Sequence, residues 1–165
     1  MEYIQRKKSS LKGLKKTNDE FNLLIKDMSV KEAYRFYDDN KSKYKYNTPE
    51  TKEEFFNMTG GRCSFCTRRI MDYNSEMTVE HIQTKVSKPS KIFEWKNLLC
   101  SCRTCNNKRN EYPYDKNKYL DPTKVKDISK YFEFKMDGTI KVAKGLTKSE
   151  EEKAAYMIDM YKLNR

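Results

Sequence analysis

The stretch Thr78-Val79-Glu80-His81-Ile82 carries the only histidine of the chain. Cys63-Ser64-Phe65-Cys66 precedes it, and Cys102-Arg103-Thr104-Cys105 follows it. Two residues between paired cysteines let both thiolates reach one tetrahedral ion, so two such pairs predict a closed Cys₄ zinc site. Four thiolates leave no position for water, which makes this zinc structural. The sequence therefore predicts a loop clamped by zinc that presents an acid, Glu80, beside a potential general base.

Other interpretations of the cysteines remain open. The two pairs are separated by 35 residues, longer than in a short zinc ribbon, so a functional loop must be inserted between them. Gly60 and Gly61 ease the tight backbone ahead of the first pair. Four unrelated buried thiols, or a redox Cys-x-x-Cys, are the alternatives. The fifth cysteine, Cys100, is either a small buried apolar residue or the fourth ligand in place of Cys102.

The composition favours a small basic domain that binds a polyanion. The chain has 165 residues and a formal charge of +11, from 35 Lys+Arg against 24 Asp+Glu. A basic surface concentrates nucleic acid, although an AT-rich genome also yields lysine-rich proteins. Apolar residues make up 36% of the chain, so the core is thin and a metal site would strengthen it.

The sequence contains no run of the ~18–20 apolar residues that a membrane span requires. No apolar segment follows the basic opening residues 1–8, so no secretory signal is expected. Five cysteines without an export signal favour thiolates and metal over disulfides. We expect a cytoplasmic protein that has no membrane partner.

The periodicity predicts an α+β fold with three parts. Residues 1–60 form a helical N-terminal region, whose helices over 18–28 and 30–38 and from Thr48-Pro49 are marked by apolar spacing and a helix-start signal. Its first helix is expected to bury Phe21, Leu24, Ile25 and Met28, and its second Val30, Ala33, Tyr34 and Tyr37.

The other two parts are the cysteine-bounded core and the C-terminal region. Residues 61–112 are expected to fold as strand, loop, strand and helix, with the strand at 77–82 and the helix at 103–110. Residues 113–165 are expected to form a hairpin over 131–142, turning at Asp137-Gly138, and a helix from Thr147. The three parts are expected to pack as one unit, with the helical N-terminal region docking a partner.

His81 and Glu80 are the leading catalytic candidates. Imidazole is the side chain whose ordinary pKa lies near neutrality, which suits a general base. The Glu80 carboxylate offers a hard oxygen ligand for Mg²⁺ or Mn²⁺. The plain alternatives are a packed histidine and a surface acid.

Four further residues complete the candidate site. Asn106 follows Cys105 and offers an amide oxygen as a second ligand of the catalytic ion, or else caps the last helix. Asn97 can hydrogen-bond the backbone and hold the histidine loop. Lys108 and Arg103 are candidates for nucleic-acid contacts. Asn110, one turn after Asn106, is a weaker ligand candidate.

These motifs, in this order and spacing, resemble an HNH endonuclease of the ββα-metal type: Cys-x-x-Cys, Glu-His-Ile, Trp-Lys-Asn-Leu-Leu and Cys-x-x-Cys-Asn-x-Lys. More narrowly, the chain is similar to the PtuB-like HNH effectors of Septu and retron-associated anti-phage systems. That similarity lies in the opening Met1-Glu2-Tyr3-Ile4-Gln5-Arg6, in residues 61–70, and in Tyr119-Leu120-Asp121-Pro122-Thr123-Lys124 with Tyr131-Phe132-Glu133-Phe134.

The resemblance implies a ββα-metal core held by zinc on Cys63, Cys66, Cys102 and Cys105. It also implies a general-base role for His81, a catalytic Mg²⁺ or Mn²⁺ on Glu80 and Asn106, and support from Asn97. Family members act with an ATPase partner, of the PtuA type in Septu, and cut nucleic acid in infected cells.

Two departures from the family pattern leave the path of the histidine loop open. Thr84 stands where a proline is often found three residues after the histidine, and the usual glycine pair of the following loop is absent.

The expected function is metal-assisted phosphodiester hydrolysis, with DNA as the expected target. The rival from another class is a catalytically silent zinc module that binds nucleic acid or a protein; it explains the cysteines and the charge equally well. RNA, including tRNA, is the alternative target, because no residue singled out here reads a 2′-hydroxyl.

Overall fold

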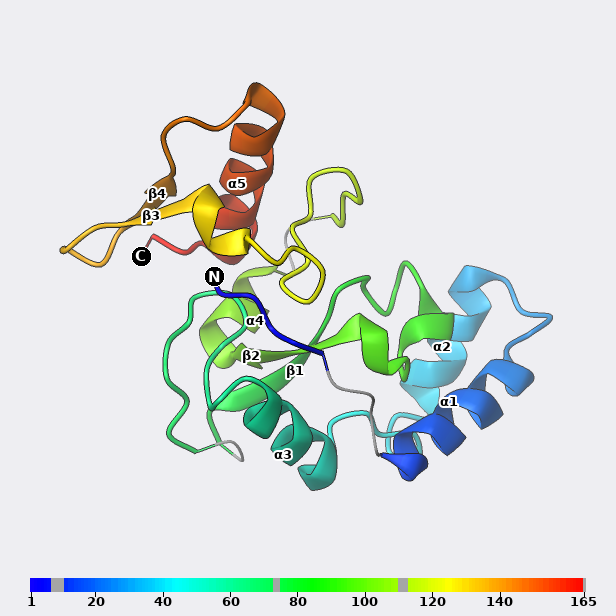
Figure 1. Cartoon of the computed structure of the whole chain (residues 1–165). Coiled ribbons are helices and arrows are strands. Elements are labelled where there is room, and N and C mark those ends of the chain that lie inside the picture. Colours follow the sequence, from blue (N-terminus) through cyan, green and yellow to red (C-terminus); the bar gives the residue numbers. More distant parts are fainter. Residues whose placement is uncertain (7–10, 73–74, 110–112, 165) are drawn as a thin grey trace.

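The computed structural model describes residues 1–6, 11–72, 75–109 and 113–164, except the side chains of Lys108 and Arg109. Its centre is an antiparallel pair, β1 (Met77–His81) and β2 (Leu98–Cys102), followed directly by helix α4 (Arg103–Arg109). The register pairs Met77 with Cys102 and His81 with Leu98. The expected order of strand, loop, strand and helix is thus confirmed, and Figure 1 shows it in the middle of the molecule.

Three helices precede this core in the chain: α1 (Lys12–Leu24), α2 (Val30–Asp39) and α3 (Pro49–Met58). Helices α1 and α2 pack on the short 3-10 helix η1 (Pro89–Lys91), within the long loop that joins β1 to β2. An aromatic cluster forms this contact, and within it the ring centroids of Phe21 and Phe93 lie 5.1 Å apart. The N-terminal helices therefore hold the loop that follows His81.

Helix α3 packs against β1 and β2. Its Phe55 ring stacks on Trp95 with a centroid distance of 4.1 Å. Trp95 begins the short 3-10 helix η2 (Trp95–Asn97) that leads into β2. Helix α3 thus braces the turn just before the second strand.

Residues 1–6, ahead of the predicted helices, form neither helix nor strand. Met1 and Ile4 are buried, and the Ile4 amide donates to the Pro122 carbonyl at 2.8 Å. The predicted buried face over 18–28 is half wrong, since Leu24 and Met28 are 48% and 37% exposed. The reason is that α1 starts at Lys12 and ends at Leu24, so Met28 lies beyond the helix.

The second N-terminal helix also departs from its expected face at one end. Val30 is its first residue and is 54% exposed, whereas Ala33 and Tyr37 are buried.

The C-terminal region follows the expected pattern. Strands β3 (Phe132–Phe134) and β4 (Ile140–Val142) pair antiparallel after the 3-10 helix η3 (Ile128–Tyr131) and before α5 (Lys148–Tyr161). Helix α5 packs on α4 and β4, and its Tyr161 ring stacks on Phe65 at a centroid distance of 3.7 Å. Phe65 stands between the first two cysteines, so the tail helix reaches the cysteine loop. Within the described ranges, no helix is long and apolar enough to cross a membrane.

Candidate active site and metal centre

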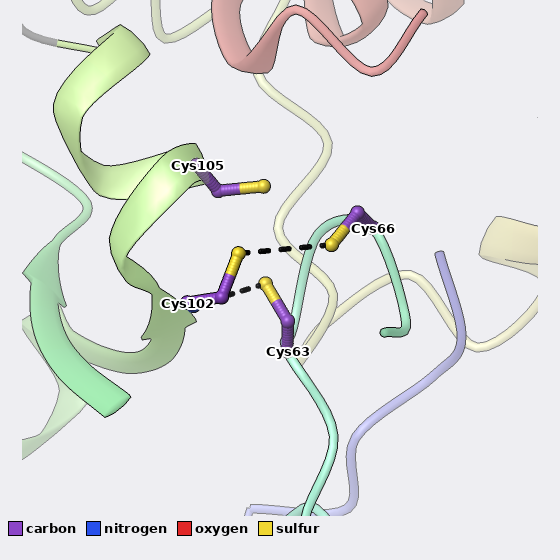
Figure 2. A group of neighbouring side chains, drawn as sticks. All are labelled: Cys63, Cys66, Cys102 and Cys105. Atoms are coloured by element: carbon purple, nitrogen blue, oxygen red, sulfur yellow. Dashed lines mark hydrogen bonds between the residues drawn. The ribbon is translucent and has the colours of Figure 1, made fainter. Parts of the chain in front are cut away.

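Four cysteine side chains converge where the core meets the segment before β1. Cys63 and Cys66 lie in a tight loop, Cys102 ends β2, and Cys105 lies in the first turn of α4 (Figure 2). The loop is closed by hydrogen bonds from the Cys63 amide to the Arg68 carbonyl at 3.0 Å and from the Thr67 amide to the Cys63 carbonyl at 3.1 Å. Residues distant in the sequence thus present their thiols to one point.

Gly61, just ahead of this loop, is required by its backbone. It has a φ of +71°, and a Cβ there would lie 2.9 Å from the Phe56 ring. A side chain at this position would therefore be strained and would also clash.

The geometry of the thiols fits a tetrahedral zinc ion. All four sulfurs lie within 4.8 Å of one another, and those of Cys66 and Cys102 are 3.9 Å apart. Zn–S bonds of about 2.3 Å in a tetrahedron place the sulfurs about 3.8 Å apart. The Cys102 amide donates to the Cys63 sulfur at 3.3 Å, the kind of contact that stabilises a metal-bound thiolate. Hydrogen bonds from the thiols of Cys105, Cys63 and Cys66 lower the pKa of Cys102, whereas the hydrogen bonds with Cys102 raise the pKa of Cys63 and of Cys105, so Cys102 ionises before those two.

The fifth cysteine stands apart from this group. Cys100 is fully buried in β2, and burial raises its pKa to about 12, so it stays a neutral thiol. The group of four contains Cys102 and not Cys100, which decides the alternative ligand set against Cys100. Cys100 is a small buried residue of the core.

His81 ends β1 and is buried. Its Nε2 lies 3.0 Å from the Ile92 carbonyl oxygen. A carbonyl only accepts hydrogen bonds, so Nε2 carries the proton and Nδ1 is the basic nitrogen of the neutral ring. The Tyr46 ring meets the imidazole edge-on, with centroids 4.5 Å apart. The backbone and this tyrosine together fix both the tautomer and the plane of the ring.

Glu80 and Asn106 lie on elements that pack against each other. Glu80 is buried in β1, opposite Leu99 of β2, and α4 packs on both strands. Asn106 is partly buried in α4, one residue after Cys105. A carboxylate and an amide oxygen are the donors that Mg²⁺ and Mn²⁺ prefer, so the donor set fits such an ion. The alternative of Asn106 as a helix cap is wrong, because α4 begins three residues earlier at Arg103.

Asn97 ties the two ends of the long loop together. Its Oδ1 accepts from the Gln83 amide at 2.8 Å, and its Nδ2 donates to the carbonyls of Gln83 at 3.1 Å and Lys91 at 2.9 Å. The Asn97 carbonyl also accepts from the Ile82 amide at 2.8 Å. This buried side chain thereby fixes the backbone on both sides of the segment that supplies Ile92, the partner of His81. The Thr84 turn, where a proline is often found, closes through Thr84 and Ser87 side-chain hydrogen bonds instead.

The two basic candidates, Arg103 and Lys108, both belong to α4. Arg103 is exposed at the start of α4, where its amide donates to the Glu76 carbonyl at 3.3 Å. Lys108 belongs to α4, but its side chain lies outside the described part, and Asn110 lies outside it altogether.

Three residues near the site are not among the candidates predicted from the sequence: Arg6, Tyr46 and Lys85. Arg6 donates to the carbonyls of Trp95 at 2.7 Å and Leu98 at 2.9 Å, on either side of Asn97. Tyr46 contacts His81, and Lys85 donates to the Tyr46 hydroxyl at 3.2 Å. Arg6 lies in the opening stretch already associated with the resemblance, whereas only the alternation of Lys and Tyr over 43–46 draws attention to Tyr46.

Comparison with known proteins matches part of the sequence to a family. Residues 63–111, from the first cysteine of the site past the end of α4, match the family described as HNH endonuclease. This segment is similar to HNH domains. The chain is also 31% identical over 78 residues to the Septu protein PtuB of Bacillus thuringiensis. The matched residues make up 47% of this chain and 30% of that protein, so the chain spans well under two thirds of its relative. The two matches confirm the resemblance to HNH endonucleases and to PtuB.

Proposed function

We propose that the protein is a metal-dependent HNH endonuclease that hydrolyses phosphodiester bonds of nucleic acid, with DNA as the expected substrate. The observation that carries the proposal is the hydrogen bond from His81 Nε2 to the Ile92 carbonyl, within a segment similar to HNH domains. It leaves Nδ1 as the basic nitrogen of a buried ring whose orientation is fixed. The net charge of +11 favours a polyanionic substrate.

In the proposed reaction, His81 Nδ1 takes a proton from a water molecule as the water attacks phosphorus. Glu80 and Asn106 would hold a Mg²⁺ or Mn²⁺ ion, which supplies charge stabilisation at the phosphate and the leaving oxygen. Asn97 keeps the loop, and with it the Ile92 carbonyl, in place. A positioned base typically contributes ~10²–10⁴-fold to the rate.

A plasmid-nicking assay tests the nuclease. We expect the full chain to nick supercoiled DNA with Mg²⁺ or Mn²⁺, and His81→Ala to lose at least ~10²-fold in rate. His81→Ala should still contain zinc and bind DNA. EDTA should stop cleavage reversibly before the zinc site unfolds. Cleavage by His81→Ala at the wild-type rate would refute the base, and no cleavage by either protein would favour the silent zinc module.

The same assay on RNA addresses the target. Cleavage of tRNA or other RNA but not of DNA would replace the expected substrate. It would leave the roles of His81, Glu80 and Asn106 unchanged, because the chemistry acts on the phosphate that both polymers share.

We further propose that the nuclease acts in anti-phage defence beside an ATPase partner of the PtuA type. The relative is named as a protein of the Septu system, which suggests the setting. A nuclease that meets invading nucleic acid inside the cell would work in the cytoplasm, where thiols stay reduced.

The α1–α2 apolar patch is the candidate surface for this partner. It comprises four large apolar residues that remain exposed where α1 ends and α2 begins: Leu23, Leu24, Met28 and Val30. Leu23 is 68% exposed. Exposed apolar residues gathered in this way are typical of protein-binding surfaces.

Co-expression with the ATPase tests the patch. The double variant Leu23→Glu/Val30→Glu should no longer co-elute with the ATPase in size-exclusion chromatography and should keep its zinc content. Met136→Glu, at an exposed apolar residue of the β3–β4 turn, is the control that should still co-elute. Co-elution of the double variant would count against the patch.

A further inference from the structure

Lys85 lies four residues after the end of β1, against two tyrosine rings. Its side chain is partly buried, and its Nζ lies 5.6 Å from the centre of the Tyr37 ring and 5.3 Å from that of Tyr46. The ammonium also donates to the Tyr46 hydroxyl at 3.2 Å. Two aromatic rings from the N-terminal region thus hold one cation from the histidine loop.

Among the described residues, no carboxylate forms an ion pair with Lys85. Two other partly buried lysines have such partners: Lys91 pairs with Glu94 at 3.9 Å, and Lys135 pairs with Glu133. Removing an ammonium from water costs free energy, and aromatic faces return only part of it. A cation held in this way keeps its attraction for an anion.

One tyrosine links the ammonium to the candidate base. Tyr46 accepts a hydrogen bond from the ammonium and makes the edge-on ring contact with His81, so the same side chain contacts both groups. Tyr46 is itself only partly buried and lies in the connection between α2 and α3. The helical N-terminal region therefore supplies part of the wall around His81.

We propose that Lys85 binds a substrate phosphate beside His81, and that Tyr46 positions both side chains. The inference rests on the proposed nuclease function and deepens it by naming a phosphate-binding residue. An ammonium has three N–H donors, of which one is used on Tyr46, so two remain for phosphate oxygens. Tyr46 braces the imidazole with its ring and the ammonium with its hydroxyl. It is a positioning residue and does not take part in proton transfer.

Binding measured without cleavage tests the proposal. The probe is a short fluorescein-labelled DNA duplex, with the same sequence as RNA in parallel, and affinity is measured by anisotropy at several salt concentrations. The full chain carries His81→Ala so that the probe stays intact. Loss of one phosphate contact makes the slope of log K against log[salt] shallower by ~0.9 for a duplex.

Lys85→Met should weaken binding roughly tenfold and make the salt slope shallower by ~0.9, the contribution of one phosphate contact. Lys85→Arg should retain the slope, because it keeps the charge. The matched control is Lys88→Met, an exposed lysine of the same loop, which should change affinity far less. Equal effects of Lys85→Met and Lys88→Met, or a wild-type slope for Lys85→Met, would overturn the proposal.

Tyr46→Phe provides a second test if Lys85→Met fails to fold. It keeps the ring against His81 and removes the hydroxyl that binds the ammonium. We expect weaker binding of the duplex and, in the chain with His81 restored, a higher KM with an unchanged pH profile. Wild-type affinity and KM in Tyr46→Phe would overturn the role of Tyr46 and, where Lys85→Met does not fold, the proposal as a whole. If the wild-type chain binds phosphate through Lys85 but cleaves nothing, the nuclease assignment fails and the phosphate site stands.

Discussion

Asn97 and Gln83 form a reciprocal pair, in which the Gln83 amide donates to the Asn97 side-chain oxygen at 2.8 Å and the Asn97 amide group donates back to the Gln83 carbonyl at 3.1 Å. The pair joins the residue before β2 to the second residue after β1. It closes the long loop at its base and so determines where the Ile92 carbonyl meets His81.

Replacing Asn97 should therefore disturb both stability and cleavage. Asn97→Ala leaves the Gln83 amide and two carbonyls without their partner, and each buried unsatisfied group costs about 1–3 kcal/mol. We expect a lower free energy of unfolding in urea and a large loss of nicking activity. Asn57→Ala, at an exposed asparagine of α3, is the control. If Asn97→Ala unfolds like the wild type but nicks DNA slowly, Asn97 acts only by positioning the loop and does not stabilise the fold.

The metal content of the cysteine variants should separate the fifth cysteine from the other four. We expect one zinc ion per chain by elemental analysis of the purified protein. Cys105→Ser should lose it and unfold at a lower temperature, because zinc binding contributes to folding. Cys100→Ala should retain the ion, since Cys100 lies outside the group of four. A zinc-free wild-type protein, or loss of zinc in Cys100→Ala alone, would contradict this ligand set.

Arg6 should stabilise the turn that carries Asn97. Arg6→Ala removes both hydrogen bonds to the carbonyls of Trp95 and Leu98, and also the guanidinium 5.8 Å from the centre of the Trp95 ring. We expect destabilisation of about 1–3 kcal/mol and reduced cleavage. Arg6→Lys should be intermediate, because an ammonium lacks the planar fork of donors. Arg35→Ala, at an exposed arginine of α2, should match the wild type. Unfolding of Arg6→Ala at the wild-type temperature would contradict the contact.

The start of α5 should contribute a pH-dependent part of the stability. A hydrogen bond from the Lys130 ammonium at 2.8 Å, joined by those from Thr147, lowers the pKa of Glu150 to about 2 from its ordinary 4.5. Because the pKa falls on folding, this stabilisation is present above pH 4.5 and is lost as the pH falls toward 2.

Thermal unfolding followed by circular dichroism tests whether the stabilisation by Glu150 is lost as the pH falls. Glu150→Gln should unfold at a lower temperature than the wild type at neutral pH, and the difference should shrink between pH 4.5 and 2. Glu151→Gln, at an exposed acid of the same turn, is the control. A difference that grows on acidification would contradict the assignment.

Much of the fold could be predicted because its signals are local. Thr48 and Thr147 accept hydrogen bonds from the first turns of α3 and α5, so both helix starts are visible in the sequence. Helix α1 follows Leu11, whose side chain makes no capping hydrogen bond, and it starts at Lys12 and not at the predicted residue 18. A helix without a polar cap gives no signal at its first residue.

In the candidate site too, the parts set by local sequence could be predicted, and the parts set by long-range packing could not. The spacing within Cys63-x-x-Cys66 and Cys102-x-x-Cys105 is a local requirement of one ion, so the sequence alone predicts the group of four. The contacts of Arg6 with Leu98 and of Lys85 with Tyr46 join residues 92 and 39 positions apart. Such contacts depend on how helices and loops pack, and no local pattern encodes them.

The stacking of Phe65 on Tyr161 couples the cysteine loop to helix α5, two stretches that lie far apart in the sequence. Phe65 stands between two zinc-ligand candidates, and Tyr161 is the last residue of α5. A truncation that removes the tail helix would take away the ring on which Phe65 stacks and so loosen the loop that carries Cys63 and Cys66. The last helix thus supports the loop of a cysteine group that lies much earlier in the chain.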